Sequence, residues 1–79
     1  MSKKIEEGRQ LVIDWAIKNG FQLDKWGNYK NAVDTDRIKL NPNKVRFEVK
    51  RAGSWMRIKS GYYSKISIGE NGKLKGLDF

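Results

Sequence analysis

The chain of 79 residues contains no cysteine and no histidine, and it has a single proline. The missing cysteine excludes disulfides, and the two absences together exclude thiol and imidazole nucleophiles, the Ser-His-Asp triad, zinc fingers and imidazole-bound metals. A chain this short buries only about 60% of the surface that its unfolded state exposes. It must therefore rely on one tight core, on association with a second copy, or on both, and we expect one small domain over residues 1–79 that is a monomer or a homodimer.

The sequence also lacks a long apolar run. Hydrophobic residues make up 38% and charged residues 33%, which is typical of a globular chain, and no stretch approaches the roughly 20 apolar residues that cross a bilayer. Lys3 and Lys4 are similar to the start of a signal peptide, but Glu6, Glu7 and Asp14 interrupt the apolar segment that should follow. We therefore expect a cytoplasmic protein with no membrane partner.

The net charge of +8 comes from the second half of the chain. Residues 1–36 carry six basic and six acidic side chains, whereas residues 37–79 carry eleven basic and three acidic ones. A field of one sign attracts a polyanion, although the same excess could serve solubility alone. What separates these interpretations is whether the cations share one face.

Residues 3–19 have the periodicity of an amphipathic helix. Ser2 suits an N-cap and Asn19-Gly20 suits a C-terminal stop. Ile13 and Ile17 widen the apolar arc, which indicates either wrapping by the next segment, the interpretation we favour, or a dimer contact. The apolar side consists of Ile5, Gly8, Leu11, Val12, Trp15 and Ala16.

Residues 21–36 have no sustained period. Phe21-Gln22-Leu23 alternates like a short strand, and residues 25–28 are a turn-like break. We interpret residues 24–36 as a loop that could include a short strand. Trp26, beside a glycine, is interpreted as half-buried filler rather than as part of a binding face.

From residue 37 the period changes to 2, which is typical of an antiparallel meander. A loop at residues 41–44 sets Ile38 opposite Phe47, and a loop at residues 51–54 sets Val49 opposite Met56 and Phe47 opposite Ile58. Further loops at residues 60–62 and 70–72 extend the same register, with the pairs Met56–Ile66, Ile58–Ser64 and Ile68–Leu74. Because a slip of one residue would reverse the sides, we predict an α+β fold in which the N-terminal helix packs on a meander of about five strands over residues 37–77.

Alternation assigns basic and aromatic side chains to the other face of this sheet. Trp55 on a solvated basic face suits base stacking, while lysine and arginine follow phosphates; the alternative is that the indole covers the stems of Lys50 and Arg57. For Tyr63 a purely structural role beside a turn is favoured. The candidate nucleic-acid-binding residues are Arg37, Lys39, Arg46, Lys50, Trp55, Arg57, Lys59, Tyr63 and Lys65.

We therefore predict a small nucleic-acid-binding protein that performs no chemistry and needs no cofactor. Its partner is DNA or RNA, with single strands favoured over duplexes, and its size is typical of phage or mobile-element accessory proteins. A second hypothesis is an inhibitor or adaptor that docks on an acidic protein partner.

Glu48-Val49-Lys50, preceded by Asp34 and Asp36, resembles the (D/E)xK signature of the restriction-endonuclease-like nuclease family. The resemblance covers residues 34–50. It implies that Asp34 or Asp36 binds a divalent metal together with Glu48, and that Lys50 orients the attacking water. We favour the simpler interpretation that Glu48 bridges Arg37 and Arg57 across strands, and we expect no catalytic residue and no metal.

Overall fold

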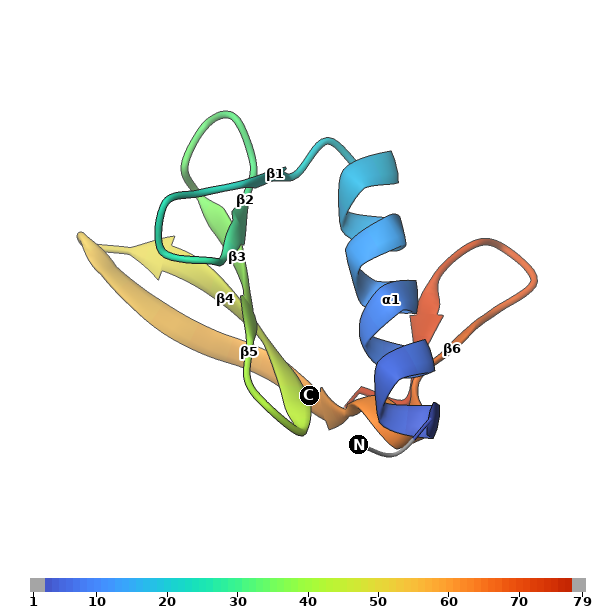
Figure 1. Cartoon of the computed structure of the whole chain (residues 1–79). Coiled ribbons are helices and arrows are strands. Elements are labelled where there is room, and N and C mark those ends of the chain that lie inside the picture. The colour runs from blue at the N-terminus through green and yellow to red at the C-terminus, as the bar shows by residue number, and fades with distance from the viewer. Residues whose placement is uncertain (1–2, 78–79) are drawn as a thin grey trace.

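The computed structural model describes residues 3–77, which form one long helix, a five-stranded sheet and a separate hairpin (Figure 1). This arrangement confirms the predicted α+β fold with an N-terminal helix and a five-stranded antiparallel sheet. Helix α1 lies between the large sheet and the C-terminal hairpin (Figure 1). The elements are α1 (Lys3–Lys18), β1 (Gln22–Leu23), β2 (Tyr29–Lys30), β3 (Asp36–Leu40), β4 (Lys44–Arg51), β5 (Ser54–Tyr62), the 3-10 turn η1 (Tyr63–Lys65), β6 (Ser67–Ile68) and β7 (Leu74–Lys75).

Helix α1 ends where the sequence predicts. Gly20 adopts a left-handed φ of 86°, its N–H donates to the carbonyl of Ile17 at 3.2 Å, and the N–H of Phe21 donates to the carbonyl of Ala16 at 2.9 Å. These two bonds form a Schellman motif, and the rings of Phe21 and Trp15 pack 6.1 Å apart beside it. The predicted cap at Ser2 lies outside the described residues.

The predicted apolar side of α1 faces the sheet. Val12 and Ala16 are fully buried, and the ring of Trp15 meets that of Phe47 on β4 edge-on at 5.9 Å. Ile17 is 59% exposed, so the following segment does not wrap this residue, contrary to the interpretation that we favoured. The core therefore lies between α1 and one face of the sheet, and the opposite face remains open to solvent.

The predicted register holds between β3 and β4 and at the start of β5. Ile38 pairs with Phe47, and Val49 pairs with Met56. The large sheet begins earlier than predicted, because β1 and β2 add two short strands beside β3 in the order β1-β2-β3-β4-β5. The meander thus extends from Gln22 to Tyr62, not over residues 37–77.

The predicted register between β4 and β5 is wrong from Ile58 onward on β5. Glu48 pairs with Arg57 whereas Phe47 pairs with Lys59, so Ile58 is an extra residue on β5 and forms a β-bulge. After the bulge, the side chains of β5 project to the sides opposite to those predicted. Lys59 therefore lies on the apolar side, where its ammonium is 5.3 Å from the centre of the Phe47 ring. The predicted Phe47–Ile58 pair does not form.

The chain leaves the sheet after residue 62, where the sequence predicts another hairpin loop. Tyr63 is fully buried in the core, and this burial raises the pKa of its phenol. Such depth is possible because η1 packs against α1 at Gly8, where a Cβ would overlap the carbonyl oxygen of Tyr63. The predicted pairs Met56–Ile66 and Ile58–Ser64 are therefore wrong.

The last predicted hairpin is confirmed. Ile68 pairs with Leu74 around residues 70–72, and Gly72 has a φ of 78°. This hairpin forms its own two-stranded sheet instead of extending the meander. Within residues 3–77, no helix is long and apolar enough to cross a membrane.

Candidate functional site

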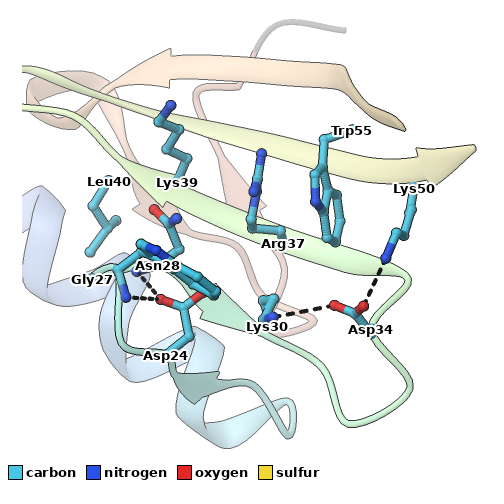
Figure 2. A pocket seen from close by; sticks show the side chains of 11 residues that line it. Asp24, Gly27, Asn28, Lys30, Asp34, Arg37, Lys39, Leu40, Lys50 and Trp55 are labelled. Carbon is cyan, nitrogen blue, oxygen red and sulfur yellow. Dashed lines mark hydrogen bonds and ion pairs between the residues drawn. The ribbon is translucent and has the colours of Figure 1, made fainter. Parts of the chain in front are cut away.

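The face of the sheet opposite α1 carries a groove of about 600 Å³ (Figure 2). One side of the groove is the turn between β1 and β2, and its floor is formed by β3, β4 and β5. Its charged and aromatic lining consists of Lys30, Arg37, Lys39, Lys50, Trp26, Trp55, Asp24 and Asp34.

Strand pairing explains why the cations share this face. Lys30 pairs with Arg37, Arg37 with Glu48, and Glu48 with Arg57, so these four side chains form one row across four strands. Directly paired residues in an antiparallel sheet project to the same side. The neighbouring pairs on this side are Lys39–Arg46 and Lys50–Trp55.

Six of the nine predicted binding residues therefore lie on the face opposite α1: Arg37, Lys39, Arg46, Lys50, Trp55 and Arg57. The other three do not, because the bulge and η1 redirect them. Lys59 faces the apolar side, Tyr63 is buried in the core, and Lys65 lies in η1. These three residues do not belong to the candidate site.

Trp55 lies between two cations (Figure 2). The guanidinium carbon of Arg37 is 4.3 Å from the centre of the indole, and the ammonium of Lys50 is 5.6 Å from it. The indole thus makes the cation–π contacts that are the alternative to stacking, with Arg37 in the place of Arg57. Arg37 and Lys50 lie on opposite sides of the indole (Figure 2).

Glu48 is the buried anion beneath this face, with 6% of its surface exposed. Its Oε1 accepts a hydrogen bond from the Nε of Arg37 at 2.8 Å, and its Oε2 lies 3.8 Å from Nη1 of Arg46. The predicted bridge from Glu48 to Arg37 is confirmed, but the second partner is Arg46 instead of Arg57. Arg57 is exposed and donates to the hydroxyl of Ser60 at 3.2 Å. The buried carboxylate therefore fixes two of the basic side chains from below.

The turn at residues 24–28 presents Trp26 to solvent. Oδ1 of Asp24 accepts hydrogen bonds from the backbone N–H groups of Trp26 and Asn28, both at 2.9 Å, and Gly27 has a φ of 84°. Trp26 is 68% exposed and lines the groove with Trp55, so our interpretation of Trp26 as half-buried filler is wrong. The ammonium groups of Lys25 and Lys30 lie 4.6 and 5.5 Å from its ring centre.

Sequence reasoning missed four of the eight charged and aromatic residues of the groove, namely Asp24, Trp26, Lys30 and Asp34, all within residues 21–36, where the sequence has no sustained periodicity. A signal was present. Residues 24–28 combine a turn-forming aspartate with a glycine. On either side of them, residues 22–23 and 29–30 each place an apolar residue next to a polar one, and together these features predict a short hairpin.

The residues that resemble a nuclease signature are engaged in other contacts. Glu48 is held by two arginines, Asp36 accepts a hydrogen bond from the side chain of Asn31 at 3.1 Å, and Lys50 donates to Asp34 at 2.9 Å. In the part of the chain that the structure describes, no group of three acidic side chains could hold a metal ion.

Comparison with known protein families, curated proteins and solved structures finds no match to this chain.

Proposed function

We propose that this protein binds nucleic acid in the groove on the sheet face opposite α1 and performs no chemistry on it. The observation that carries the proposal is the lining of that groove, where two indoles and four cations meet in one concave surface. Lysine and arginine neutralise phosphates, and an exposed indole stacks on any base. The groove thus combines the two contacts that binding of a nucleic acid without sequence preference requires.

Single strands suit this groove better than duplexes. Base faces are accessible in a single strand, whereas a duplex hides them in its stack. Trp26 is exposed for 68% of its surface on a turn at the side of the groove, where an unpaired base could stack on it. The phosphates flanking that base would then contact Lys30, Lys39 and Lys50. A cytoplasmic location, as predicted from the sequence, is consistent with this activity.

A binding panel tests the proposal. Oligonucleotides of ten residues, single-stranded and double-stranded, as DNA and as RNA, are titrated with the protein at two ionic strengths. We expect single strands to bind more tightly, with log affinity falling against log salt at a slope of about −3, which corresponds to roughly four phosphate contacts.

Absence of binding to every oligonucleotide at low salt would contradict the proposal. Such a result would favour our second hypothesis, an adaptor whose basic face docks on an acidic protein. Tighter binding to the duplex than to the single strand would be compatible with the groove as a nucleic-acid-binding surface, but it would contradict base stacking on the indoles.

A further inference from the structure

One carboxylate of this chain already lies among the cations of the groove. Oδ2 of Asp34 accepts a hydrogen bond from the ammonium of Lys50 at 2.9 Å, and Oδ1 lies 3.4 Å from the ammonium of Lys30 (Figure 2). Lys30 comes from β2 and Lys50 from the end of β4, so two strands on either side of β3 each supply one lysine to this anion.

The loop between β2 and β3 holds Asp34 in this place. Oδ1 of Asn31 accepts hydrogen bonds from the backbone N–H groups of Thr35 and Asp36, both at 3.0 Å, and the N–H of Asp34 donates to the carbonyl of Asn31 at 3.2 Å. The backbone N–H of Lys50 donates to the carbonyl of Thr35 at 2.8 Å, which ties the loop to β4. The carboxylate is therefore positioned by its backbone.

The same two lysines also border the indoles. Lys30 lies 5.5 Å from the ring centre of Trp26, and Lys50 lies 5.6 Å from that of Trp55. A pair of ammonium groups flanked by two stacking surfaces is the arrangement that a phosphate between two unpaired bases would require. In the free protein the anion at that position is Asp34.

We infer that Lys30 and Lys50 form a phosphate-binding site and that Asp34 competes with the incoming phosphate for it. The inference rests on the proposed function. Binding is then an exchange of anions, in which the two lysines release the carboxylate and take a phosphate oxygen. Without a ligand, the carboxylate relieves the repulsion between the lysines and keeps the groove assembled.

The exposure of these groups makes the exchange feasible. The side chain of Asp34 is 48% exposed, and those of Lys30 and Lys50 are 29% and 37% exposed. Ion pairs with this much solvent contact are weak and are screened by salt. A phosphate can therefore displace the carboxylate without the cost of breaking a buried pair.

The test compares Asp34→Asn with Asp14→Asn. Asparagine has nearly the same shape and tolerates the left-handed φ of 59° at position 34. Asp14→Asn removes the same charge from the exposed side of α1, where the aspartate accepts a hydrogen bond from Gln10. The probe is a fluorescein-labelled ten-residue thymidine oligonucleotide, and thermal melting verifies that both variants are folded.

We expect Asp34→Asn to bind the oligonucleotide about three- to tenfold more tightly than the wild type at low salt, the range for removing one or two exposed competing ion pairs. Asp14→Asn should change the affinity by less than about twofold, since it lies outside the groove. Adding Lys50→Ala to Asp34→Asn should abolish the gain.

Equal or weaker binding by Asp34→Asn, with the wild type still binding, would overturn the inference and leave the proposed function in place. Failure of the wild type and of both variants to bind would overturn both. If Asp34→Asn does not fold, the carboxyl carbon-13 signal of Asp34 in the wild type replaces it as the readout. A shift of that signal on adding the oligonucleotide supports the exchange, and an unchanged signal with the ligand bound contradicts it.

Discussion

The guanidinium of Arg37 contacts both Trp55 and Glu48. Its central carbon lies 4.3 Å from the centre of the indole, and its Nε donates to the buried carboxylate at 2.8 Å. These two contacts hold the guanidinium of Arg37 against one side of the indole. Lys50 lies on the other side of the indole, 5.6 Å from the ring centre, and donates to the half-exposed carboxylate of Asp34. A base of the nucleic acid that we propose as ligand would therefore reach Trp55 by displacing the ammonium of Lys50.

Trp26 lies beside two lysines, Lys25 and Lys30, and is 68% exposed, so we expect it to be the principal stacking surface. Trp26→Ala should weaken binding of a single-stranded oligonucleotide by about 1–3 kcal/mol. The melting temperature should stay nearly unchanged, because the side chain is 68% exposed. Fluorescence anisotropy and thermal melting measure the two effects.

The control for Trp26→Ala is Leu23→Ala. Leu23 is 62% exposed on β1 but does not line the groove, so its loss should leave the affinity unchanged. Equal affinities of Trp26→Ala and the wild type would contradict the stacking role.

Glu48 should stabilise the fold as well as the binding face. Glu48→Gln keeps the shape of the side chain but removes the charge that Arg37 and Arg46 share, so we expect a loss of about 1–3 kcal/mol in the free energy of unfolding. Urea denaturation measures it. Glu70→Gln, in the exposed turn of the C-terminal hairpin, should change stability by less than about 0.5 kcal/mol. Equal effects of the two substitutions would show that the buried carboxylate is dispensable.

Gly8 should tolerate no side chain. A Cβ at this position would overlap the carbonyl oxygen of Tyr63, so α1 and η1 would have to separate. We expect Gly8→Ala to lower the free energy of unfolding by about 2–3 kcal/mol or more, despite the better helix propensity of alanine. Glu7→Ala, on the exposed side of the same turn, is the matched control in denaturant unfolding. A Gly8→Ala protein as stable as this control would contradict the close packing.

Asp34 should contribute to the acid sensitivity of the fold. Lys50, and after it Lys30, hold the pKa of Asp34 below its usual 3.8. The pKa of Asp34 is lower in the folded state than in the unfolded state. The ion pairs therefore stabilise the fold at pH values above the unfolded-state pKa, and this contribution is lost as the pH falls through the lowered pKa of the folded state. Melting temperatures between about pH 5 and pH 2 should fall less steeply for Asp34→Asn than for the wild type. Parallel curves would contradict the pairing.

The fold was predictable where alternation was unbroken. Ile38 and Phe47 are buried opposite each other and fix the pairing of β3 with β4, because a slip of one residue would move both to solvent. Val49 and Met56 keep their predicted pairing between β4 and β5, although Met56 is 53% exposed. The same alternation is sufficient to place Arg37, Lys50 and Trp55 together on the opposite face.

The bulge and its consequences were not predictable in this way. Ile58 is apolar and continues the alternation, so nothing in the sequence marks it as the extra residue of β5. Tyr63 is buried because η1 meets a glycine on α1, and this long-range contact has no periodic signal. Trp26 and Asp34 were missed because their turns are positioned by backbone N–H groups that donate to the side-chain oxygens of Asp24 and Asn31. A pattern of hydrophobic residues does not reveal such local hydrogen bonds.

The most direct measurement is the salt dependence of oligonucleotide binding for two variants that lose the same charge, Lys39→Gln and Lys65→Gln. Lys39 lines the groove, whereas Lys65 lies in η1, outside the binding face. If the groove binds phosphates, Lys39→Gln flattens the slope of log affinity against log salt by about 0.7 while Lys65→Gln leaves it unchanged. Equal slopes for the two variants would contradict a binding site on this face of the sheet.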